Sequence, residues 1–234
     1  MEQPHRIQAV VFDLDDTLYP ERDYVASGYA AVCGHLARSG RVDERACFDL
    51  LWSRFGSGQV AGAFDALGQA MNLNLSPDDI RDLVRVYREH TPRLEAFGGL
   101  PAMLGRLHEH LGLGLLSDGY QPAQNLKLEA LRLGRFFDEV LFTEDLGRDF
   151  WKPSPRGFEL ISRRLGAPHE RCCYVGDNPA KDFVAPNKLG WLAVQYLRPG
   201  QIHAANPAPP SGAPRVILRT PQALRKLLGV PEGS

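Results

Sequence analysis

Hydrophobic residues follow two different patterns along this chain. Residues 9–12 are apolar at every position, which is typical of a strand buried on both faces of a parallel sheet. From residue 20 to about residue 96, apolar residues instead recur at helical spacing, which predicts a run of helices. These helices are expected at residues 24–36, 45–55, 60–71 and 80–87.

In the remainder of the chain, short apolar runs alternate with helical stretches. Strands are expected at 113–116, 139–142, 172–175, 191–195 and 216–218, with helices at 101–110, 122–133, 155–165, 179–189 and 221–228. This alternation predicts an α/β fold with a doubly wound, mostly parallel, Rossmann-like sheet. The helices that follow the first strand then form an inserted α-helical cap domain. We therefore expect a core formed by residues 1–19 and 97–234 and a cap formed by residues 20–96.

The composition is that of an ordinary globular protein. The chain has 234 residues, of which 44% are hydrophobic and 24% are charged. Its net charge of -1 argues against nucleic acid or a membrane surface as a partner. No apolar run approaches the roughly 18 residues of a membrane span, and the polar N-terminus does not resemble a secretory signal. We expect a cytoplasmic protein that is a monomer or a homodimer.

Acidic residues follow the first strand directly, at Asp13, Asp15 and Asp16. Ligands of open α/β sheets bind at the carboxyl ends of the strands, so chemistry is expected at this position. Because side chains alternate along a strand, Asp13 and Asp15 are expected to point the same way and to share a small volume. Two carboxylates that close repel each other unless a proton or a cation such as Mg²⁺ is shared between them. Taken alone, the stretch is also compatible with a solvated acidic turn.

Other predicted strand ends carry polar groups as well. Ser117-Asp118-Gly119 offers a hydroxyl and backbone amides, which can cradle a phosphate. Lys152 precedes a helix that begins with proline, where its ammonium group can reach a carboxylate or a phosphoryl oxygen. Asp177 follows the strand at 172–175, and Asp182 is expected on the next helix. Since parallel strands end at one edge of a sheet, we expect these groups to lie together.

In this combination and order, the motifs resemble those of the haloacid dehalogenase-like (HAD) hydrolase superfamily. The resemblance covers almost the whole chain, and it implies a doubly wound core with a helical cap inserted after the first strand. The matching pieces are Asp13-Leu14-Asp15-Asp16-Thr17, Leu116-Ser117-Asp118-Gly119, Lys152-Pro153-Ser154-Pro155, and Gly176-Asp177-Asn178-Pro179 with Asp182.

The resemblance also implies roles for these residues. Asp13 is expected to be the nucleophile and Asp15 the acid/base, with Lys152 as the third catalytic residue. The implied cofactor is Mg²⁺, held by Asp13, Asp177 and the backbone carbonyl of Asp15, while Asp182 is an acid outside this ligand set. The phosphate is expected to contact Thr17, Ser117, Asp118, Gly119 and Lys152.

These roles make chemical sense for a phosphate ester. A carboxylate attacks phosphorus when Mg²⁺ offsets the repulsion between the anions, and an aspartyl-phosphate divides one hard step into two. Dehalogenases of similar fold lack the second acid and need no metal, so Asp15 favours phosphate-ester hydrolysis. We expect a Mg²⁺-dependent phosphatase acting on a small phosphorylated metabolite, such as a sugar phosphate or a nucleoside monophosphate.

Alternatives remain open at this point. A phosphomutase of the same family would pass the phosphoryl group back to a sugar and would be activated by a sugar bisphosphate. A non-catalytic regulatory protein that binds phosphate is the alternative from another class, and it would be favoured if Asp13 or Asp15 were absent.

Overall fold

The computed structural model describes residues 6–40 and 42–232. The chain forms two compact units, one containing the chain up to Arg22 and from Leu94 onward, the other Asp23–Arg93. Both boundaries lie three residues inside the segment 20–96 predicted as the cap. Within the described residues, no helix is both long enough and apolar enough to cross a membrane.

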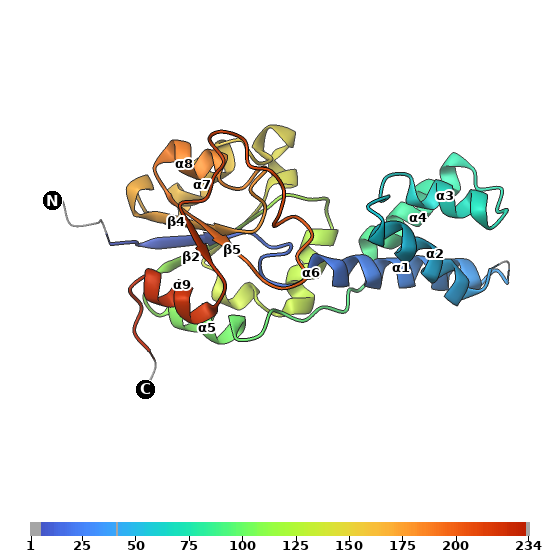
Figure 1. The fold of residues 1–234 in the computed structure, drawn as a ribbon, viewed down its shortest axis with the longest axis horizontal. Coiled ribbons are helices and arrows are strands. Elements are labelled where there is room, and N and C mark those ends of the chain that lie inside the picture. The colour runs from blue at the N-terminus through green and yellow to red at the C-terminus, as the bar shows by residue number, and fades with distance from the viewer. Residues whose placement is uncertain (1–5, 41, 233–234) are drawn as a thin grey trace. The chain divides into compact units, whose positions relative to one another are not determined.

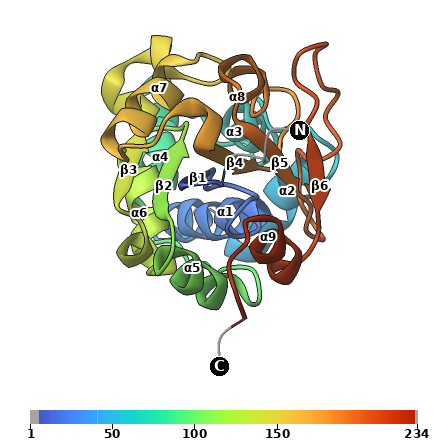
Figure 2. The same cartoon turned by 90° about the vertical axis from the view of Figure 1, so that its left-hand side faces the viewer.

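The larger unit is built on one parallel sheet (Figure 1). Its six strands follow the order β3-β2-β1-β4-β5-β6 (Figure 2). Strand β1 pairs with β2 on one side and with β4 on the other, so Val11 lies opposite both Gly114 and Tyr174. The predicted α/β fold with a parallel sheet is confirmed. The strands are β1 (Ala9–Phe12), β2 (Gly112–Ser117), β3 (Glu139–Phe142), β4 (Cys172–Gly176), β5 (Leu192–Tyr196) and β6 (Val216–Leu218).

Helices cover both faces of this sheet, with α7 and α8 on one face and α5 and α9 on the other (Figure 2). On the α7 face, the ring of Phe158 packs edge-on against the rings of Tyr174 and Trp191, with distances of 4.9 Å and 5.6 Å between ring centroids. All three side chains are fully buried. The α-helices of this unit after the first strand are α5 (Leu100–His108), α6 (Ala123–Leu131), α7 (Arg156–Arg164), α8 (Val184–Leu189) and α9 (Pro221–Leu227). Short 3-10 helices η2 (Thr143–Leu146) and η3 (Arg148–Phe150) follow β3.

The helix predicted at residues 179–189 begins later than expected. Helix α8 starts at Val184, and the residues before it form a turn after β4. In this turn the carboxylate of Asp182 accepts a hydrogen bond from the backbone N–H of Asn178 at 2.9 Å. This local bond holds the backbone in the turn. The prediction that Asp182 lies on the helix was therefore wrong, because it lies between β4 and α8.

The smaller unit is helical and has its own core, in which Val32, Leu51 and Leu67 are fully buried. Helix α4 begins as its sequence predicts, because Ser76 and Asp79 form a reciprocal capping box around Pro77. Each of the helices predicted here is present, although α3 begins three residues after the predicted start at residue 60. The helices are α1 (Glu21–Ala37), α2 (Glu44–Gly56), α3 (Ala63–Ala70) and α4 (Pro77–Glu89).

Glycine at position 114 allows α7 to pack closely on the central strands. A Cβ atom built on Gly114 would lie 2.8 Å from Cδ1 of Ile161 and 3.2 Å from Cγ2 of Val11. Gly112 lies two residues earlier, on the same face of β2. The nearest heavy atoms to a Cβ atom built on Gly112 would be 3.7 Å away. The two glycines therefore differ in the space around them and provide a matched pair.

Substituting Gly114→Ala is expected to lower the free energy of unfolding by about 1–3 kcal/mol, because Val11 and Ile161 are fully buried and the added methyl group overpacks them. Gly112→Ala is the control and should change stability by less than about 0.5 kcal/mol. Urea denaturation of both variants measures the difference. An equal loss of stability in both would show that close packing against α7 is not the reason for glycine at 114.

Candidate active site

Asp13 lies directly after β1, the strand between β2 and β4. Its backbone N–H donates to the carbonyl of Val175 at 2.9 Å, so the contact between β1 and β4 continues to this residue. The side chain is buried, and its Oδ1 atom accepts a hydrogen bond from Nζ of Lys152 at 2.5 Å. Burial raises the pKa of Asp13 to about 7, although the ammonium group of Lys152 acts in the opposite direction.

Lys152 is a buried cation whose side chain is only 1% exposed. Besides Asp13, its Nζ donates to the hydroxyl of Tyr174 at 2.9 Å and to Oδ1 of Asp182 at 2.9 Å. Burial alone would lower the pKa of Lys152, but Asp13 and Asp182 outweigh it and hold this pKa well above its ordinary value. Burial likewise opposes ionisation of Asp182, yet Lys152 keeps the pKa of that carboxyl below its usual range. Lys152 and Asp182 therefore form a charged pair.

Asp177, at the end of β4, completes a group of carboxylates. Oxygen atoms of Asp13, Asp177 and Asp182 lie within 4.8 Å of one another. Oδ1 of Asp177 accepts a hydrogen bond from the hydroxyl of Thr17 at 3.4 Å, whereas Oδ2 is buried without a hydrogen-bond partner among the described residues. Burial and the neighbouring carboxylates raise the pKa of Asp177 well above its usual range. A buried oxygen without a donor, next to further carboxylates, fits a hard divalent cation such as Mg²⁺.

The carboxylate of Asp15 lies among a separate set of donors. Its Oδ1 accepts hydrogen bonds from Nζ of Lys127 at 2.8 Å and from the hydroxyl of Tyr19, and its Oδ2 accepts one from Nε2 of Gln124 at 2.9 Å. Burial raises the pKa of Asp15, but these donors outweigh it and the pKa lies below its ordinary value. Asp15 is not in the group of close carboxylates, and its role as a metal ligand through its carbonyl stays a prediction.

Gln124 and Lys127 are site residues that the sequence reasoning missed. They lie three residues apart on α6, on the face that also buries Leu128 and Leu131. Gln124 is 1% exposed and Lys127 is 5% exposed. A glutamine and a lysine on the buried stripe of an amphipathic helix are unusual, because such residues rarely lie inside a protein unless they are paired. This break in the pattern is the signal that could have located them.

Asp118 links several segments at the carboxyl edge of the sheet. Its carboxylate accepts hydrogen bonds from the hydroxyl of Thr143 at 2.8 Å and from the backbone N–H of Lys152 at 3.2 Å. Lys181, also missed from the sequence, lies in the turn before α8 and brings its Nζ to 3.4 Å from Oδ2 of Asp118. Asp118 thereby connects the ends of β2, β3 and β4.

The neighbouring residues Ser117 and Gly119 pack against α6. The hydroxyl oxygen of Ser117 accepts a hydrogen bond from Nε2 of Gln124 at 2.8 Å. Gly119 has a φ angle of 136°, and a Cβ atom there would lie 2.7 Å from Cδ of Gln124, so glycine is needed for this close approach. The structure thus gathers the predicted residues at one edge of the sheet, while their individual roles stay predictions: Asp13, Asp15, Thr17, Ser117, Asp118, Gly119, Lys152, Asp177 and Asp182.

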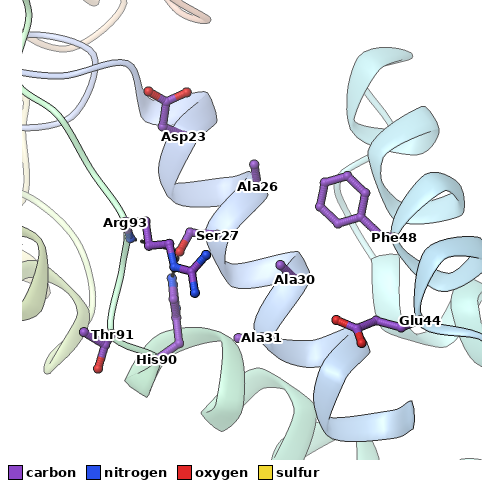
Figure 3. A pocket seen from close by; sticks show the side chains of 10 residues that line it. All are labelled: Asp23, Ala26, Ser27, Ala30, Ala31, Glu44, Phe48, His90, Thr91 and Arg93. Atoms are coloured by element: carbon purple, nitrogen blue, oxygen red, sulfur yellow. Dashed lines mark hydrogen bonds between the residues drawn. The ribbon is translucent and has the colours of Figure 1, made fainter.

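The smaller unit contains a cavity of its own, of about 650 Å³. It lies between α1, α2 and the segment after α4 (Figure 3). Ala26 and Ala30 line it from α1, and Phe48 lines it from α2. At its other side the hydroxyl of Ser27 accepts a hydrogen bond from the backbone N–H of Arg93 at 3.1 Å. Apolar walls with a few polar groups are typical of pockets for small organic molecules.

The carboxylates and lysines lie at the carboxyl edge of the parallel sheet, where open α/β folds bind their ligands. The family model for haloacid dehalogenase-like hydrolases matches residues 7–190, and the chain belongs to this family. The resemblance inferred from the motifs is thus confirmed.

Relatives of this chain carry two kinds of name. It is 27% identical to a glyceraldehyde 3-phosphate phosphatase from Methanopyrus kandleri over 93% of this chain and 95% of that protein. It is 26% identical to an (S)-2-haloacid dehalogenase from Pseudomonas putida over 79% of this chain and 82% of that protein. The HAD hydrolase YfnB from Bacillus subtilis, solved with bound magnesium, shares the fold with a TM-score of 0.67 at 20% identity, covering 96% of this chain and 100% of that one.

The stability of the metal-free protein is expected to fall as the pH rises from about 4 to 7. Asp13 has a pKa near 7 when folded, against about 3.9 when unfolded, so the folded state binds more protons in this window and loses stability as they leave. Asp177 acts with the same sign. Asp15 and Asp182, whose pKa values are lowered, stabilise the fold throughout this window and lose that contribution only as the pH falls below about 4.

Thermal unfolding in EDTA at pH 5 and pH 7.5 measures this effect, and Mg²⁺ should raise Tm more at pH 7.5 than at pH 5. Asp13→Asn serves as the comparison and should flatten the pH dependence, because an amide does not titrate. A Tm in EDTA that rises over this range would contradict the electrostatics described for the acid group.

Proposed function

We propose that the protein is a Mg²⁺-dependent phosphatase that hydrolyses small phosphorylated metabolites through an aspartyl-phosphate on Asp13. The observation that carries the proposal is the different surroundings of the two acids after β1. Asp13 contacts the cation of Lys152 and belongs to the same group of carboxylates as Asp177, whose Oδ2 has no hydrogen-bond partner among the described residues; this suits a metal-assisted nucleophile. Asp15 has its own set of donors, which suits a separate proton-transfer role.

The substrate class is proposed from the relatives and from the smaller unit. Phosphatase relatives named for glyceraldehyde 3-phosphate favour a small sugar phosphate over a nucleoside monophosphate. We assign residues 20–96 as a cap that excludes water from the reaction and selects the substrate.

In the first half of the reaction, Asp13 attacks the phosphorus atom. Its Oδ1 is fixed by Lys152, and among the described residues its Oδ2 has no hydrogen-bond donor, so Oδ2 is the oxygen that forms the new bond. The bond between phosphorus and the ester oxygen breaks. Asp13, Asp177 and the carbonyl of Asp15 would hold Mg²⁺, which supplies positive charge between the two anions.

Asp15 transfers protons in both halves. It gives a proton to the leaving ester oxygen and then takes one from the water that attacks the aspartyl-phosphate, which releases phosphate and regenerates Asp13. Lys127 and Gln124 hold the carboxylate ionised, as the second half requires. A bound phosphate dianion raises the pKa of a nearby carboxyl, and this supports protonation of Asp15 for the first half.

A panel of phosphate esters with Mg²⁺ tests this function, and sugar phosphates are expected to be the best substrates. Asp13→Asn should lower kcat by roughly 10⁴-fold or more, because an amide cannot form the aspartyl-phosphate. EDTA should abolish activity and Mg²⁺ should restore it, whereas Ca²⁺ should restore it poorly because of its larger size and looser geometry. Release of chloride from 2-chloropropionate without metal, together with no phosphate-ester hydrolysis, would show that the protein is a dehalogenase.

Asp15→Asn is expected to slow phosphorylation of Asp13 by roughly 10²–10⁴-fold for esters with a poor leaving group. The loss should be smaller for p-nitrophenyl phosphate, whose leaving group departs without a proton. Rapid-quench measurements on both ester types report this step directly. Asp16→Asn is the control, because the Asp16 carboxylate accepts a hydrogen bond from the backbone N–H of Glu21 and should show no dependence on the leaving group. An equal loss for both esters in Asp15→Asn would rule out the acid role.

A further inference from the structure

The family motif supplies one lysine to this site, Lys152, whose ammonium donors all have protein partners in this structure. An ammonium group has three N–H donors. Those of Lys152 are matched by three acceptors, Oδ1 of Asp13, Oδ1 of Asp182 and the hydroxyl of Tyr174, at 2.5 to 2.9 Å. A substrate oxygen would have to displace one of these buried partners. Lys152 is therefore built to hold Asp13 in place.

Lys181 provides a second ammonium group at the same edge of the sheet. It belongs to the turn after β4, and its Nζ reaches Asp118 in the turn after β2. In the sheet β1 lies between these two strands. The side chain of Lys181 therefore crosses the end of β1, where Asp13 is located.

The contacts of Lys181 leave N–H donors of its ammonium group available for an anion. Its contact with Oδ2 of Asp118 is long, at 3.4 Å, and no other hydrogen bond from its ammonium group is found among the described residues. Its side chain is 36% exposed, whereas that of Lys152 is 1% exposed. Although burial disfavours its charge, the nearby carboxylates of Asp13, Asp182 and Asp118 raise its pKa and keep it a cation.

We propose that Lys181 contacts the phosphoryl group, donating to a non-bridging oxygen of the substrate, while Lys152 holds the nucleophile. This assignment rests on the proposed phosphatase function. It makes Lys181 a substrate-binding residue and Asp118 its positioning partner. Because the contact exists both before and during phosphoryl transfer, it contributes mainly to binding, so its loss raises KM more than it lowers kcat.

The test compares Lys181→Ala, Lys181→Arg and, as a matched control, Lys188→Ala, which removes an exposed lysine from α8. Calorimetry measures the Kd of inorganic phosphate with Mg²⁺ present, and steady-state kinetics gives KM and kcat for an ester that the wild type hydrolyses. Lys181→Ala should raise the Kd and KM by about 10- to 100-fold, the effect of one charge-assisted hydrogen bond. Lys181→Arg should recover most of this loss, and Lys188→Ala should behave as the wild type.

The outcomes separate this inference from the function on which it rests. If the wild type binds phosphate and Lys181→Ala binds it as tightly as Lys188→Ala does, the assignment of Lys181 is wrong and the phosphatase function stands. If Lys181→Ala lowers Tm and Lys181→Arg recovers neither Tm nor phosphate affinity, Lys181 is a structural residue and the assignment again fails. A wild type that neither binds phosphate nor hydrolyses any phosphate ester would overturn both proposals.

Discussion

The buried ammonium group of Lys152 joins three segments that are far apart in the sequence. It comes from the segment between η3 and α7 and meets Asp13 after β1 and Asp182 before α8. Transferring these charges out of water costs several kcal/mol per ion, and only a complete set of short contacts offsets that cost. The hydroxyl of Tyr174 completes the set. The fold around the carboxylates and the position of Asp13 therefore depend on the same contacts.

The order of the strands explains why these contacts are possible. With β1 between β2 and β4, the turns that follow all three strands open at one edge of the sheet. In this arrangement the carboxylate of Asp118 accepts hydrogen bonds from Thr143 after β3, from the backbone N–H of Lys152, and from Lys181 after β4. A side chain displaced from one of these turns would thus disturb the others, so the edge behaves as one polar network rather than as separate motifs.

The sequence predicted the strand ends well, since a fully apolar run followed by Asp13 or Asp177 has few other interpretations. It did not predict the turn that holds Asp182, because the hydrogen bond from Asn178 that shapes this turn depends on a side chain. Gln124 and Lys127 were missed because each looks like an ordinary helical residue until the buried face of α6 is known. Hydrophobic periodicity locates elements, whereas partners across the sheet require the three-dimensional fold.

The pKa values of Asp13 and Asp15 are shifted in opposite directions, and this difference has a chemical meaning. Burial raises the pKa of Asp13, so its charge near neutral pH depends on cations around it. The positive charge of Lys152 is shared with Asp182, and Asp177 adds a further buried carboxylate whose Oδ2 has no donor among the described residues. Asp15 is paired with the ammonium group of Lys127, and the pKa of Asp15 is lowered. Neighbouring groups whose environments separate their pKa values are typical of sites that divide nucleophilic attack and proton transfer between two residues. The lysine on α6 therefore matters as much to this division as the lysine of the family motif, because it allows two carboxylates so close in the sequence to behave differently.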